Sequence, residues 1–121
     1  MSDITEIGTV IVPVSNQDKA LAFYVDVLGF EVRLDGPFGE GRWLEVAPPG
    51  AARTLALVAC DDTGGEVSFT TRDADADHAR LVAAGVEVDA GVMRMGDGVP
   101  PMFTFRDPDG NRCRVVERPL G

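Results

Sequence analysis

The stretch VSNQDKALAFYVDVLGFEV, residues 14–32, decides the fold, because the chain contains a similar stretch again at residues 71–88, TRDADADHARLVAAGVEV. Each stretch predicts the end of a strand, a capping Asn or Asp, a short helix, a glycine and an apolar strand. Later, Pro48-Pro-Gly50 is echoed by Pro108-Asp-Gly110 at a similar offset. A duplicated unit indicates two equivalent modules, neither of which has to bury its apolar face alone.

Alternating apolar residues and turn residues predict the other elements of each module. In the first module we expect strands at 7–14, 30–34, 42–47 and 54–59, a helix after Asn16, and a glycine-rich turn at 35–41. In the second we expect strands at 66–71, 86–89, 102–105 and 113–117, a helix at 74–84, and an irregular stretch at 91–101.

Each module is therefore βαβββ, which predicts the α+β fold class. We expect two βαβββ modules to form a cup-shaped sheet with the helices outside. The expected domain organisation is a single domain over residues 1–121, with module one at 1–62 and module two at 63–121.

Composition excludes several classes of protein. The formal net charge of −9 argues against binding to nucleic acid or to anionic membranes, which would need an excess of Lys and Arg. Two cysteines are too few for a disulfide scaffold, and they lack the spacing of a metal site. No stretch approaches the roughly 20 apolar residues of a membrane span, and no secretory signal is evident. We therefore expect a cytoplasmic protein.

Three segments carry a resemblance to a known family: VPVSN at 12–16, AFYVDVLGF at 22–30 and FRDPDGN at 105–111. Together they resemble the vicinal oxygen chelate superfamily, which includes glyoxalase I, extradiol dioxygenases, fosfomycin-modifying enzymes and bleomycin-binding resistance proteins. The resemblance covers nearly the whole chain. It implies paired βαβββ modules and a homodimer, and in the family's enzymes a divalent metal held by three or four His, Glu or Gln ligands.

Transferring the family's metal positions to this chain gives Thr9, Glu66, Arg114 and, on the fourth strand, either Thr54 or Ala56. Only Glu66 could ligate a metal as written. A guanidinium stays protonated and has no lone pair to offer, so Arg114 would repel the ion that the family places there. The sequence therefore predicts no metal and no other cofactor.

Glu66 and Arg114 come from strands of the same module and leave three interpretations open. They could form an ion pair where the metal would have been, with the guanidinium replacing the cation. Arg114 could instead be free to bind a carboxylate or phosphate of a ligand. In the third interpretation the predicted register is one residue off and Arg114 points to solvent.

Aromatic residues on the predicted strands are candidates for ligand stacking. By the internal repeat, Trp43 corresponds to Phe103 and Glu45 corresponds to Phe105. Aromatic side chains on cup-facing strands would stack on a planar ligand. The alternative is that they form the ordinary core between the sheets.

Phe38, Met93, Met95 and Met102 lie in or beside the two glycine-rich stretches. Methionines in such loops adapt to apolar ligands of varied shape, so these residues are candidates for a cavity rim. The same stretch could equally be a plain connection. The lone histidine, His78, is on a predicted helix and is expected to pack outside the cup rather than to act as a base.

The leading hypothesis is a metal-free small-molecule binding protein that holds a partly apolar or aromatic antibiotic or metabolite. The alternative is a lyase, isomerase or dioxygenase-like enzyme with an atypical metal site, or with a desolvated Glu66 as its base. A third hypothesis is a dimeric module whose cup is filled by its own side chains. The expected partners are a small molecule and a second copy of the chain. The candidate ligand-binding residues are Thr9, Phe38, Trp43, Glu45, Glu66, Met93, Met102, Phe103, Phe105 and Arg114.

Overall fold

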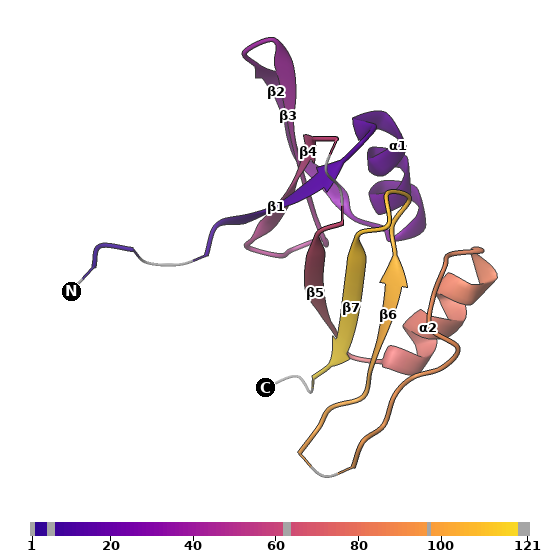
Figure 1. Ribbon diagram of the computed structural model, residues 1–121. Coiled ribbons are helices and arrows are strands. Elements are labelled where there is room, and N and C mark those ends of the chain that lie inside the picture. The colour runs from indigo at the N-terminus through magenta and orange to yellow at the C-terminus, as the bar shows by residue number, and fades with distance from the viewer. Residues whose placement is uncertain (1, 5–6, 62–63, 97, 119–121) are drawn as a thin grey trace. The chain divides into compact units, whose positions relative to one another are not determined.

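The computed structural model describes residues 2–4, 7–61, 64–96 and 98–118. The chain divides into two compact units, Met1–Asp62 and Thr63–Gly121, and each contains its own small sheet and its own helical segment (Figure 1). We call these the N-terminal unit, with sheet A, and the C-terminal unit, with sheet B. The architecture is α+β, as predicted.

The N-terminal unit has the predicted βαβββ order. Sheet A has the strand order β1-β4-β3-β2, in which β1 runs parallel to β4 and the other neighbours are antiparallel. Its elements are β1 (Thr9–Val14), α1 (Gln17–Ala22), the π-helical segment η1 (Phe23–Val27), β2 (Glu31–Phe38), β3 (Gly41–Ala47) and β4 (Thr54–Ala59).

Helix α1 begins where the sequence predicted. Asn16 adopts an extended conformation, and its side chain accepts a hydrogen bond from the backbone N–H of Lys19 at 2.9 Å, as an N-cap does. Helices α1 and η1 bury Ala20, Phe23 and Tyr24, and α1 packs on β4. One face of sheet A is therefore covered, and its core side chains are Val12, Val14, Leu44, Val46, Leu55 and Leu57.

The C-terminal unit repeats this plan with fewer strands. Helix α2 packs against β6 and β7, and Asp73 caps it by accepting from the N–H of Ala76 at 3.0 Å. The strand order of sheet B is β5-β7-β6, with β5 parallel to β7. The elements are β5 (Glu66–Thr71), α2 (Ala74–Ala83), β6 (Met102–Arg106) and β7 (Arg112–Glu117).

The predicted strand at 86–89 is not a continuous strand. Among the described residues, the strand-type pairing of this segment with β6 consists of two isolated bridges, Val88 to Phe105 and Met93 to Met102. Between them, the side chain of Asp89 accepts the N–H of Thr104 at 2.9 Å. A short acidic side chain that bonds the backbone in this way takes the place of the next ladder partner, so pairing stops there.

The predicted glycine-rich turn at 35–41 is also wrong in extent. Strand β2 continues to Phe38, which pairs with Gly41, and only Gly39 and Glu40 form the turn. Gly39 has a positive φ of 60°, which explains why glycine suits this tight hairpin.

Among the described residues, no helix is both long and apolar enough to cross a membrane.

The turn between β6 and β7 is tied to the start of β5 by a fully buried side chain. Asn111 is 0% exposed, and its Oδ1 accepts the N–H groups of Gly64 and Gly65 at 3.1 and 2.5 Å. Its Nδ2 donates to the buried carboxylate of Asp107 at 2.8 Å. The side-chain amide of Asn111 therefore bonds both to the residues just before β5 and to the turn between β6 and β7.

Replacing this amide should be costly. Asn111→Ala removes the side-chain acceptor of two backbone donors and one of the donors to the Asp107 carboxylate, so we expect the free energy of unfolding to fall by about 2–4 kcal/mol. Urea denaturation followed by circular dichroism measures it. Pro108→Ala, in the same turn but exposed, is the control and should change stability by less than about 1 kcal/mol. Equal effects of the two substitutions would contradict the role of Asn111.

Candidate functional site

Each sheet has one face covered by its helix, and the opposite face carries the candidate residues. In sheet A, Glu45 on β3 lies opposite Ala56 on β4 and opposite Leu34 on β2, and Ala56 pairs in turn with Ile11 on β1. Side chains of directly paired residues share a face, so these four form a row across the side of the sheet opposite the helix, in which Ala56 is fully buried.

The open face of sheet A is largely apolar. Ile11 is 60% exposed, Leu34 is 51% exposed and Phe38 is 66% exposed. The Phe38 ring lies against Trp43 with the ring centroids 5.4 Å apart and the planes tilted by 53°. Several large apolar side chains that remain in solvent on one face of a sheet are typical of a surface that binds a ligand or a partner. The two rings form an aromatic corner beside the aliphatic row.

One carboxylate lies within this apolar face. Glu45 is partly buried, and its two oxygens accept separate hydrogen bonds, from the indole Nε1–H of Trp43 and from the hydroxyl of Thr54, each at 2.6 Å. The Thr9 hydroxyl lies 2.8 Å from that of Thr54 and donates to the Thr54 carbonyl at 3.0 Å. The structure thus brings Thr9, Trp43 and Glu45 together, with Thr54 as the link.

The hydrogen bonds to Glu45 favour its ionised form. The Thr54 hydroxyl, and then the Trp43 indole, hold the pKa of the Glu45 carboxyl below its usual value, against a smaller opposing effect of burial. The carboxylate is therefore charged at neutral pH. It presents a negative charge on a surface that is otherwise apolar.

Sheet B has an open face of a different character. Arg114 pairs with Ser68 and with Thr104, so it points away from α2. Its guanidinium reaches Glu66, with 3.3 Å between Nη2 and Oε1, so the ion-pair interpretation describes the structure. The two side chains are 43% and 53% exposed, and a pair so open to water contributes little to stability.

Phe103 and Phe105 do not lie on this open face, which differs from the prediction. They pair with Val115 and Cys113, are 1% and 2% exposed, and belong to the core under α2. The His78 ring contacts Phe103 edge-on at 5.2 Å, which gives this histidine a packing role. The repeat alignment was one residue off, and such a slip moves every side chain of a strand to the other face.

The pairing registers give the correct correspondence between the two sheets. Glu45 pairs with Ala56 in sheet A, and Thr104 pairs with Arg114 in sheet B, so Glu45 corresponds to Thr104. Trp43 lies two residues before Glu45 and therefore corresponds to Met102 rather than to Phe103. The same registers answer the question left open for the fourth strand. Ala56, not Thr54, is the counterpart of Arg114.

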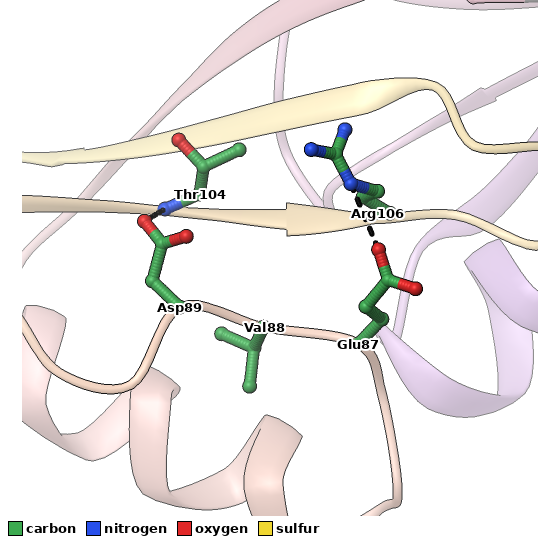
Figure 2. Close-up of a pocket in the computed structure, with 5 residues that line it drawn as sticks. All are labelled: Glu87, Val88, Asp89, Thr104 and Arg106. Carbon is green, nitrogen blue, oxygen red and sulfur yellow. Dashed lines mark hydrogen bonds and ion pairs between the residues drawn. The ribbon is translucent and has the colours of Figure 1, made fainter.

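A shallow pocket of about 140 Å³ lies at the interrupted edge of sheet B, and none of its residues was predicted as a site (Figure 2). Glu87 binds Arg106 at 2.8 Å, and Asp89 binds the backbone of Thr104. Both acidic side chains point toward β6, whereas Val88 points to the other side. These charged groups are thus engaged with β6, and a regular strand at 86–89, which the alternating pattern predicts, would not form such a pocket.

The remaining candidates, Met93 and Met95, are 51% and 65% exposed, and Met93 is bridged to Met102. The bridge places Met93 beside the start of β6.

The residues at the family's metal positions do not fit a metal. Of Thr9, Glu66 and Arg114, only Glu66 is a good ligand, and its carboxylate is bonded to the Arg114 guanidinium. Within residues 2–4, 7–61, 64–96 and 98–118, no group of three or more His, Cys, Asp or Glu side chains is placed to hold an ion.

Comparison with proteins of known structure finds close relatives of this fold. TnmS3, an antibiotic binding protein from Streptomyces sp. CB03234, is 38% identical with a TM-score of 0.86, over 97% of this chain and 98% of that one. A member of the Glyoxalase/bleomycin resistance protein/dioxygenase superfamily from Sphaerobacter thermophilus DSM 20745 is 35% identical with a TM-score of 0.86, over 95% and 98% of the two chains.

Sequence comparison agrees. The protein YetH of Bacillus subtilis (strain 168) is 33% identical over 115 residues, which covers 89% of this chain and 94% of YetH. The model of the Glyoxalase/Bleomycin resistance protein/Dioxygenase superfamily matches residues 6–115. This chain therefore belongs to the Glyoxalase/Bleomycin resistance protein/Dioxygenase superfamily.

Proposed function

We propose that this protein binds a small, planar, largely apolar molecule, such as an antibiotic or an aromatic metabolite, on the open face of sheet A and without a metal ion. The observation that carries the proposal is the exposure of Ile11, Leu34 and Phe38 on the face of sheet A that also carries Trp43. Covering such side chains with a flat hydrophobic ligand removes apolar area from water on both partners. The tilted ring pair of Phe38 and Trp43 offers an edge and a face to an aromatic ligand.

The composition of this face favours a small molecule as its occupant. Sites for small ligands are mostly apolar and contain a few placed polar groups that set the orientation. Here the apolar row surrounds a single oriented carboxylate, Glu45, rather than the many charged and polar groups of a protein interface rim. The similarity to an antibiotic binding protein at 38% identity supports the same class of ligand for this chain.

Metal independence is supported by the chemistry of the C-terminal unit. Arg114 brings a permanent positive charge to the carboxylate that a family metal would need. The competing hypothesis, in which Glu66 acts as a base, requires a desolvated carboxylate. Glu66 is instead 53% exposed and has a guanidinium partner, so this environment does not favour the enzyme hypothesis.

A homodimer belongs to the same proposal. Within the described residues, β1 pairs only with β4 and β5 pairs only with β7, so each of these first strands has an open edge. Ile7, just before β1, is 67% exposed, and Val10, near the start of β1, is 40% exposed. An open strand edge with apolar neighbours is readily covered by a second copy of the chain.

The ligand surface can be tested by truncating its exposed side chains. Ile11→Ser and Phe38→Ser should each weaken binding of uncharged acridine by about tenfold, because each removes one apolar contact with the ligand. Quenching of Trp43 fluorescence at mildly alkaline pH measures the affinity. Val82→Ser, which truncates a similarly exposed residue of α2, should leave it unchanged. Full binding by both β-sheet variants would show that the ligand lies elsewhere.

Metal independence can be tested by calorimetric titration with Mn²⁺, Ni²⁺ and Zn²⁺. We expect no stoichiometric binding to the wild type. Arg114→Glu should gain measurable affinity, because it removes the cation and places two carboxylates side by side. Arg53→Glu makes the same change of charge at an exposed turn and should gain none. Stoichiometric binding of a metal by the wild type would overturn the metal-free proposal.

Light scattering coupled to size exclusion tests the dimer. The expected mass is twice the 12.9 kDa of one chain at micromolar concentration. A monomer under these conditions would be evidence against the dimer, and it would leave the ligand surface of sheet A as a separate question.

A further inference from the structure

We propose that the ligand carries a protonated amine next to its planar apolar body, and that Glu45 is the group that receives it. This inference rests on the proposed function, since it assumes that the ligand lies on the open face of sheet A. Beyond the proposed function, it specifies the charge of the ligand and its polar group, which the apolar surface alone does not determine.

The first argument is that Glu45 has acceptor capacity left over. An ionised carboxylate has about four lone-pair sites. Among the described residues, Trp43 and Thr54 donate to Glu45, one to each oxygen. Each oxygen therefore retains a site for a further donor. The two existing bonds hold the carboxylate in one orientation, so a ligand group that meets it does not have to order it first.

The second argument is that, among the described residues of the N-terminal unit, no cationic side chain is bonded to Glu45. Its neighbours across the strands are Ala56 and Leu34, which carry no charge. The arginines of the adjoining strands are engaged elsewhere. Arg33 binds Glu31 and the carbonyls of Pro48 and Ala51.

Arg42, on the same strand as Glu45, is held by two other acids. It binds Asp35 at 2.8 and 2.9 Å and Asp18 at 2.7 Å. The donors to Glu45 in the described part of the chain are neutral. A partly buried anion in an apolar surface attracts a cation strongly, because the low local dielectric weakens screening.

The third argument comes from the position of the aromatic corner. The indole that donates to Glu45 is the same ring that contacts Phe38. A flat ligand lying on this corner would therefore have its edge beside the carboxylate. An ammonium group one or two bonds from the aromatic body would reach the carboxylate, and the face of Trp43 adds a cation–π attraction.

The hydrogen bonds also keep the charge available over a wide range of pH. They hold the pKa of Glu45 below its usual value, so the carboxylate stays ionised under mildly acidic conditions. A ligand without a donor would have to cover this charge without pairing it, and leaving a charged group unpaired is costly. The site should therefore discriminate between amines and their uncharged analogues.

A different role for Glu45 would be to hold the Trp43 ring in place and nothing more. In that case, replacing Glu45 would weaken all aromatic ligands to the same degree. Under the proposal, the loss is confined to ligands with the amine. The comparison of two ligands with one variant therefore separates the two roles.

The test uses 2-(aminomethyl)naphthalene, 2-methylnaphthalene and 2-naphthylacetate, which share one ring system and differ in charge. The protein contains a single tryptophan, so the indole Nε1–H of Trp43 gives one cross-peak in a ¹H–¹⁵N spectrum, directly at the Glu45 contact. At physiological salt, we expect the amine to bind the wild type about tenfold to a hundredfold more tightly than the methyl compound. The anionic 2-naphthylacetate should bind more weakly than either of the other two ligands.

In Glu45→Gln, which keeps the size of the side chain and one acceptor, the advantage of the amine should fall to about threefold or less. Affinity for 2-methylnaphthalene should not fall, and it should rise to the extent that covering the unpaired charge of Glu45 was costly. Asp26→Asn is the matched control for net charge, because Asp26 is exposed and belongs to η1, on the covered side of sheet A. This control should keep the full advantage of the amine.

The outcomes are distinguishable. If the wild type binds amine and methyl compound equally, the inference is overturned while the proposed function stands. If Glu45→Gln weakens both ligands equally, Glu45 only positions Trp43, and the inference is again overturned. If neither compound moves the Trp43 signal, both the inference and the proposed surface fail. The ranking of the three ligands by the wild type holds or fails even if the variant does not fold.

Discussion

The rest of the structure depends on one constraint: each sheet has a helix on one side only, and side chains alternate between the two sides. Every strand residue is therefore assigned either to a core or to an open face, with no intermediate choice. In sheet A this parity places Leu44 and Val46 in the core and leaves Trp43 and Glu45 on the open side. The chemistry of the protein follows from which residues happen to occupy the open positions.

The two open faces have different chemistry. Sheet A exposes aliphatic and aromatic side chains around one ionised carboxylate, which suits a ligand with a flat apolar body and a donor group. Sheet B exposes Arg114 paired with Glu66, together with Ser68 and Thr104, which suits polar or charged groups. In the described part of the chain, neither face carries a cluster of three or more imidazoles, thiols and carboxylates placed to hold a metal ion.

Much of the fold was predictable from local sequence signals. The caps Asn16 and Asp73, the apolar runs of β1 and β4 and the order of the first module follow from short-range chemistry, and the structure contains all of them. The family could also be recognised, because its segments are spread over nearly the whole chain. The interruption at Asp89 was not predictable, since it depends on a side chain reaching the backbone of a strand that comes 15 residues later.

The site was predictable only in part. Trp43, Glu45, Thr9 and the Glu66–Arg114 pair lie on open faces as expected, but Phe103 and Phe105 do not. The register of a strand depends on its pairing with residues that are distant in the sequence. The internal repeat predicted the register of β6 with an error of one position, and such an error exchanges the side chains of the core with those of the open face. The role of Thr54 as the link between Thr9 and Glu45 was likewise invisible, because it requires three strands to be in register.

The most direct measurement of the central claim is the set of nuclear Overhauser effects between the protein and a bound planar aromatic compound. The account predicts cross-peaks from the ligand to the methyl groups of Ile11 and Leu34 and to the rings of Phe38 and Trp43, all on the open face of sheet A. Cross-peaks confined to the methyl groups of Met93 and Met95, or to α2, would contradict it.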